Sequence, residues 1–135
     1  PNNRFESIED EKGNYQLYIG YPEVIPANFG DTLSGTLAYD LEVFRQFKHY
    51  GIEVNEPGNI NVSFRWNEVK SPKARVGLRV IAQDGSQVFS SNYFISNSYV
   101  NTGNIALSEA GNYRVEVEGT NAFAEGDFSI VINEP

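Results

Sequence analysis

The last third of the chain alternates apolar and polar residues with a period of two. Over residues 113–118 the order is Tyr113, Arg114, Val115, Glu116, Val117 and Glu118. Successive side chains of a β-strand point to opposite faces of a sheet, so this run predicts a strand with one buried and one polar face. Residues 128–132 repeat the alternation after a short connection that contains glycine. The pair predicts a hairpin that closes one side of a β-sandwich.

The same period recurs along most of the chain. Alternating stretches occupy residues 15–21, 33–37, 50–54, 60–66, 76–80 and 105–107. Asp84-Gly85 is a two-residue hairpin signal just before Val88. These runs predict an all-β protein, an antiparallel β-sandwich or jelly roll of about eight strands. We expect one domain over residues 1–135, in which the polar and acidic residues 1–12 form a leading linker.

Two stretches depart from this pattern. In residues 41–48 the apolar side chains Leu41, Phe44 and Phe47 are spaced by three, so a short helix or 3₁₀ turn competes with an irregular strand. Residues 90–104 are rich in Asn and Ser. There we expect a loop, with at most a short edge strand.

Charge and composition exclude several classes of protein. The formal net charge is −8 at pH 7, so the averaged field repels a nucleic-acid backbone. No stretch approaches the roughly 20 apolar residues that span a bilayer, and the first residues lack the pattern of a signal peptide. The absence of Cys excludes disulfides and zinc-thiolate sites but leaves the compartment open. We expect a soluble piece of a longer protein.

Several pieces of the chain, taken in order, resemble the bacterial pre-peptidase C-terminal domain. This family of β-sandwich modules follows many secreted proteases and is related to the collagen-binding domains of clostridial collagenases. The similar pieces are residues 30–37, beginning Gly30-Asp31-Thr32-Leu33, then 49–54 with 57–64, 80–86, 109–117 and 126–130. Residues 41–48 look inserted relative to the family. An insertion in a loop is a place where a member's own specificity can lie.

The two ends of the chain extend the resemblance. Residues 1–6, Pro-Asn-Asn-Arg-Phe-Glu, look like the opening of the family with its leading Glu removed, and the chain ends in Asn-Glu-Pro. This suggests a tandem array with adjacent domains as partners. The resemblance also implies a calcium site on Asn2, Asn3 and Asp31. Calcium takes about six to eight oxygen ligands, and the leading Glu is missing, so a chain without any cofactor is the alternative.

The residues argue against an enzyme. There is one His, no Cys and no Gly-x-Ser-x-Gly elbow, so common nucleophilic catalysis lacks its parts. His49 is expected to be a surface side chain. Glu116 and Glu118 are two residues apart, about 6.5 to 7 Å by strand rise, and with Arg114 beside them we expect a solvated polar face. No catalytic residue is predicted.

Aromatic side chains are the candidates for ligand binding. Large, stiff rings suit sugar or protein partners. The candidates are Trp66, Tyr93, Phe94, Tyr99 and Phe123. Trp66 shares the parity of Ile60, so the rim of the core is its default position. Tyr93, Phe94 and Tyr99 fall in the polar stretch where alternation does not demand burial.

Three functions stay open. The resemblance implies a noncatalytic accessory domain of a secreted or cell-surface bacterial protein, which spaces, stabilises or targets a neighbouring module. The first alternative is a binding module for extracellular polysaccharide or a collagen-like protein. The second is a structural unit of a surface assembly, in which strand edges pair between copies.

Overall fold

The computed structural model describes residues 24–38, 46–68, 70–94 and 99–135. Within them the chain forms ten strands and no helix. The strands are β1 Val24–Pro26, β2 Thr32–Leu37, β3 Gln46–Val54, β4 Gly58–Trp66, β5 Arg75–Ile81, β6 Gln87–Phe94, β7 Tyr99–Asn101, β8 Ile105–Leu107, β9 Gly111–Gly119 and β10 Gly126–Asn133. The expected linker 1–12, the expected strand 15–21 and most of the 41–48 stretch lie outside the described residues.

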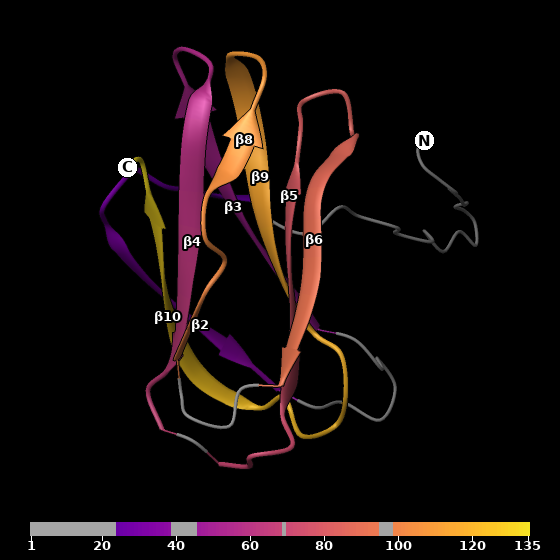
Figure 1. The fold of residues 1–135 in the computed structure, drawn as a ribbon. Coiled ribbons are helices and arrows are strands. Elements are labelled where there is room, and N and C mark those ends of the chain that lie inside the picture. The colour runs from indigo at the N-terminus through magenta and orange to yellow at the C-terminus, as the bar shows by residue number, and fades with distance from the viewer. Residues whose placement is uncertain (1–23, 39–45, 69, 95–98) are drawn as a thin grey trace, which may run out of the picture.

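The strands form two sheets that face each other (Figure 1). The first has the order β1-β3-β9-β5-β6, in which only the β1–β3 pair is parallel. The second has the order β2-β10-β4-β7, with β8 paired to the early part of β4. The prediction of an all-β sandwich is therefore confirmed.

One hydrophobic interior lies between the sheets. Its largest fully buried side chains include Tyr50, Phe64 and Phe128. The Phe64 and Phe128 rings are stacked with centroids 5.1 Å apart. The Tyr50 hydroxyl crosses from the first sheet to the second and donates to the Ser34 carbonyl at 3.4 Å. Each strand thus contributes every second side chain to one shared core.

The predicted final hairpin is wrong. β9 pairs with β3 and β5 in the first sheet, whereas β10 pairs with β2 and β4 in the second. The connection over residues 120–125 therefore crosses from one sheet to the other. Alternation shows which side chains point into the core. It does not show whether two successive strands pair in one sheet or lie in opposite sheets, because the pattern is identical in both cases.

The loop predicted over residues 90–104 is also wrong in part. β6 continues through Phe94, and β7 covers Tyr99–Asn101. The preceding turn is as predicted: Gly85 has a φ of 90°, and the Asp84 carboxylate accepts from the Ser86 amide at 2.9 Å. The hydrogen bonds from Ser86 lower the pKa of Asp84. The sequence did not predict the second half of β6, because Ser and Asn side chains differ little in hydropathy from one position to the next.

Gly35 gives a test of how tightly the two sheets pack. A Cβ at this position would lie 2.7 Å from the Tyr50 hydroxyl oxygen and still nearer the Phe128 ring. Gly35→Ala is expected to lower the free energy of unfolding by about 1–3 kcal/mol, as overpacking does. Gly58→Ala is the matched control, because nothing lies within 4 Å of its Cβ. Urea unfolding followed by the fluorescence of the single Trp measures both, and equal effects would contradict the prediction.

Candidate functional site

The outer face of the first sheet carries a row of charged side chains from three neighbouring strands. The strand register places His49 of β3 opposite Glu116 of β9, and Arg79 of β5 opposite the same Glu116 from the other side. The next residues along these strands, such as Tyr50 and Val115, point into the core. The period of two therefore separates an apolar face from an ionic face on the same three strands.

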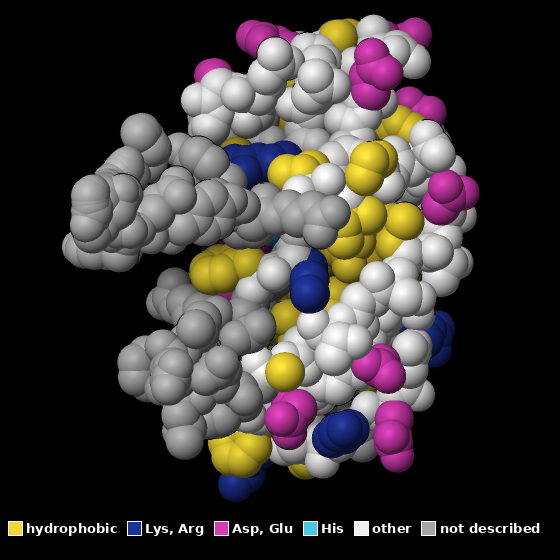
Figure 2. Space-filling view, turned by 180° about the vertical axis from the view of Figure 1, so that it is seen from behind, with side chains coloured by type: hydrophobic (Ala, Val, Ile, Leu, Met, Phe, Trp, Pro, Cys, Tyr) yellow, Lys and Arg dark blue, Asp and Glu magenta, His cyan; other side chains and the backbone are white. Residues whose placement is uncertain are grey.

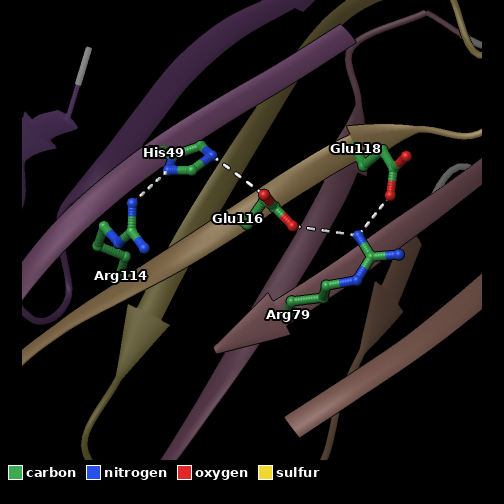
Figure 3. Close-up of polar contacts among 5 residues, drawn as sticks. All are labelled: His49, Arg79, Arg114, Glu116 and Glu118. Carbon is green, nitrogen blue, oxygen red and sulfur yellow. Dashed lines mark hydrogen bonds and ion pairs between the residues drawn. The ribbon is translucent and has the colours of Figure 1, made fainter. Parts of the chain in front are cut away.

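These side chains form a continuous network (Figure 3). Arg79 Nη1 donates to Glu116 Oε1 at 3.2 Å and also to Glu118 Oε1. Glu116 Oε2 lies 3.1 Å from His49 Nε2, although this nitrogen is not aligned for a hydrogen bond. His49 Nδ1 in turn lies 3.4 Å from Arg114 Nη1. We call these five residues the ionic network.

The ionic network is largely shielded from solvent, which corrects the expectation of a solvated polar face: Arg79, Arg114 and Glu116 are half-buried, and the other two residues are buried. His49 is only 5% exposed and Glu118 only 1%. Opposite charges from β5 and β9 meet in register, so each carboxylate loses water but gains a guanidinium. A strand taken alone shows only that its polar residues alternate. The compensating Arg79 lies 37 residues before Glu116, so no local pattern reveals the pair.

The surroundings of His49 favour its neutral form. Burial lowers its pKa, Glu116 opposes this effect, and the Arg114 guanidinium lowers the pKa further. The Arg114 guanidinium can only donate hydrogen bonds, so His49 Nδ1 must be the acceptor in this contact. The proton of the neutral imidazole is then on Nε2, on the side of Glu116. Within the network the two arginines then balance the two glutamates.

The contacts fit a structural role better than proton transfer. A general base must reach the group whose proton it takes, and a nucleophile must lie within hydrogen-bond distance of it. Within the described part of the chain, the polar contacts of His49 are with Glu116 and Arg114 alone. Neither is a hydroxyl or thiol whose proton His49 could take as a general base. The network instead ties β3, β9 and β5 together across the sheet.

A cavity of about 750 Å³ lies at one end of the network. Arg114 and Glu53 contribute charges to its lining, Gln83 and Asn112 contribute amides, and Val24 is among its apolar residues. The lining therefore combines apolar area with a few polar groups, which is typical of ligand pockets.

In the view from behind, hydrophobic side chains gather toward the middle of the visible face, while acidic side chains lie mostly toward its edge (Figure 2).

The predicted ligand-binding residues differ in their exposure to solvent. Trp66 is buried in the core and packs edge-on against Phe64 with ring centroids 5.1 Å apart. Tyr93 is half-buried against the same core. Phe94 is 68% exposed on β6 beside Arg75, and Tyr99 is 43% exposed on β7 beside Arg65. Phe123 is exposed beside Lys73.

The predicted calcium residues are only partly described. Asn2 and Asn3 lie outside the described residues. The Asp31 carboxylate accepts a hydrogen bond from the Asn28 amide at 3.4 Å. Across the described ranges, no cluster of three or more His, Cys, Asp or Glu side chains is placed to hold a metal ion. The calcium site stays a prediction from the resemblance.

Comparison with known proteins identifies the fold. No family model and no curated protein matches the chain. Among solved structures, the pre-peptidase C-terminal domain of a Bacillus anthracis collagenase is similar with a TM-score of 0.65 and 12% identity, over 86% of this chain and all of that one. The chain therefore has the sandwich fold of that domain, as the sequence resemblance predicts.

Two weaker similarities are to proteins from other bacteria. A periplasmic inhibitor of g-type lysozyme from Aeromonas hydrophila has a TM-score of 0.47 and 12% identity, over 82% of this chain and 96% of that one. A protein from Sulfurospirillum deleyianum has a TM-score of 0.45 and 12% identity, over 78% of this chain and 99% of that one. In the described part of this chain there is no helix of the length and apolarity that crossing a membrane requires.

Arg79→Met tests whether the ionic network stabilises the fold. The change leaves the Glu116 and Glu118 carboxylates without this guanidinium. Breaking a buried pair by removing one partner costs about 3–5 kcal/mol, and we expect a value near the lower end because part of Arg79 is exposed. Arg65→Met is the control, since Arg65 is exposed over the Tyr99 ring and should cost less than about 1 kcal/mol. Denaturant unfolding that gives equal losses would refute the structural role.

The lowered pKa of His49 predicts a pH dependence of stability. The unfolded histidine titrates near 6.5, whereas the folded one does so at lower pH. Between these two values the unfolded chain binds more protons, so stability rises with pH and is lost as pH falls below about 6.5. His49→Gln should flatten the slope of unfolding free energy between about pH 5 and pH 7. Parallel slopes for the two proteins would show that His49 does not contribute.

Proposed function

We propose that this chain is a noncatalytic accessory domain of a secreted or cell-surface bacterial protein, which spaces, stabilises or targets a neighbouring module. The observation that carries the proposal is the similarity in fold to a pre-peptidase C-terminal domain, over all of that domain and 86% of this chain. The ordered pieces from Gly30 to Ile130 that resemble the same family support it independently of the structure.

The chemistry of the ionic network agrees with a noncatalytic role. His49 contacts a carboxylate and a guanidinium, both of which serve to hold it in place. A network of this kind makes the sheet rigid without needing a substrate. A rigid, acidic sandwich suits a module that sits beside another one, because its net charge of −8 keeps it soluble.

A binding role is the second candidate, and two exposed aromatic side chains favour it. Phe94 and Tyr99 are exposed, and a guanidinium carbon lies 5.5 Å from the Phe94 ring centroid and 5.0 Å from that of Tyr99. Exposed rings of this size are common anchors for saccharide or protein ligands. The ligand class would be an extracellular polysaccharide or a collagen-like protein.

In-frame removal of residues 1–135 from the gene in the source organism tests both candidates. An accessory role predicts that the remaining protein loses secretion, stability or attachment while its isolated catalytic or adhesive chemistry persists. Replacement of the domain by a flexible linker of equal span should restore a spacing function. The double variant Phe94→Ala/Tyr99→Ala should instead reproduce the deletion if the domain targets by binding.

Three results would overturn the proposal. The first is a gene that encodes no further module beside these residues. The deletion could leave the location, amount and activity of the protein unchanged. Cell fractionation with an antibody against the domain could find it in the cytoplasm.

A further inference from the structure

β6 is the longest edge strand in the described part of the sandwich. The sheets end at β1 and β6 on the one hand and at β2 and β7 on the other (Figure 1). β1 and β7 have three residues each, and β1 ends in a proline, which cannot donate a backbone hydrogen bond. β2 has six residues, and β6 has eight. Among the described residues β6 pairs with β5 alone, and none of them pairs with the backbone groups on its other side.

Apart from one irregularity at its start, this edge lacks the charges and prolines that usually protect an edge strand from pairing. Natural edge strands carry charged residues, prolines or short lengths that discourage contact with another strand. Residues 85–108, which include β6, contain no charged residue and no proline, in a chain that is 21% charged overall. The register shift that the β5–β6 pair shows lies at the start of β6, opposite Val80 and Ile81. The shift skips Val88, because Val80 pairs with Phe89 and Ile81 with Gln87, and the pairing from Phe89 to Phe94 is regular.

The side chains of β6 alternate between two environments. Val88, Ser90, Asn92 and Phe94 are exposed, and Phe89, Ser91 and Tyr93 between them are half-buried. Val88 is 41% exposed and Phe94 68% exposed. Two large hydrophobic side chains therefore lie at opposite ends of the edge, with small polar residues between them.

This arrangement is complementary to itself. If two copies of β6 pair antiparallel about a two-fold axis through Ser91, residues whose numbers sum to 182 lie opposite each other. Val88 then faces Phe94 of the other copy at both ends, and Ser90 faces Asn92. On the inner side Phe89 faces Tyr93. Apolar residues meet apolar residues and hydrogen-bonding residues meet each other, which is the pattern that stabilises cross-strand pairs.

We propose that β6 is a self-association edge, through which two copies of this chain form a continuous ten-stranded sheet. A two-fold interface uses the same patch on both copies, as this register does. Each copy carries a net charge of −8, so association requires a contact that brings no like charges together, and β6 provides one. The inference goes beyond the proposed accessory function and does not depend on it.

The other long edge is a poorer match. The exposed side chains of β2 are Thr32, Ser34 and Thr36, and Thr36 already donates to Asp127 at 2.7 Å. None of them is a large hydrophobic residue.

A contact made by a single pair of strand edges is smaller than a standard protein–protein interface. The β6 dimer should therefore be weak and depend on protein concentration.

Sedimentation velocity of the full chain tests the inference. We expect a shift from monomer to dimer between about 1 µM and about 1 mM. Ser90→Lys/Asn92→Lys places lysines directly opposite each other across the proposed axis and should raise the dissociation constant by about tenfold or more. Ser34→Lys/Thr36→Lys on β2 adds the same charge to the other edge and should leave the dimer intact. Urea unfolding verifies that both variants are folded.

Cross-linking tests the register itself. Because the chain has no Cys, Ser91→Cys introduces one thiol that meets its own copy on the proposed axis, and oxidation should join two chains. Ser34→Cys on β2 should stay monomeric under the same conditions. A chain that is monomeric at every concentration, a dimer lost in the β2 variant but kept in the β6 variant, or equal cross-linking of the two thiols would overturn the inference.

Discussion

The shared interior between the two sheets is the constraint on which the rest of the structure depends. Each strand can give only one of its faces to that interior, and the stacked Phe64 and Phe128 rings with the crossing Tyr50 side chain show how closely the space is filled. Interiors at this density tolerate little change in volume. The inward face of each strand is therefore used for packing. Any binding or chemical function of the domain must lie on the outward faces, at the sheet edges or at the ends of strands.

β9 shows how strongly the two faces of one strand can differ. Its inward residues are apolar, and its outward residues Arg114, Glu116 and Glu118 belong to the ionic network. Buried ion pairs rarely stabilise a fold more than apolar residues of equal volume would. They do fix register, however. A slip of one residue between β9 and β5 would turn Glu116 toward the apolar interior or bring Arg79 there. The observed register places Arg79 opposite Glu116 and within reach of Glu118.

The sequence predicts the fold class and most strand positions, because an alternation such as Ile60 to Trp66 is a local property. It does not predict the partners of strands. Alternation alone predicts a hairpin of β9 and β10, yet the two strands lie in different sheets. The same limit applies to the site. Glu118 and Arg79 are individually ordinary surface residues in sequence, and their pairing across 39 positions, which helps to compensate the buried carboxylate, has no local signal.

The distribution of charge connects the ionic network with the open edge. The two arginines of the network balance its two glutamates, and with His49 neutral the network adds nothing to the net charge. Residues 85–108 add nothing either. The whole excess of eight negative charges must then lie on the remaining parts of the chain, where it opposes contact between copies. Electrostatic repulsion of this kind falls off with salt over roughly 10 Å at 0.1 M. Because β6 carries no charged side chain, two copies that pair along it bring no like charges of that strand together. The same net charge that keeps the domain dispersed therefore favours an uncharged edge as the place of contact.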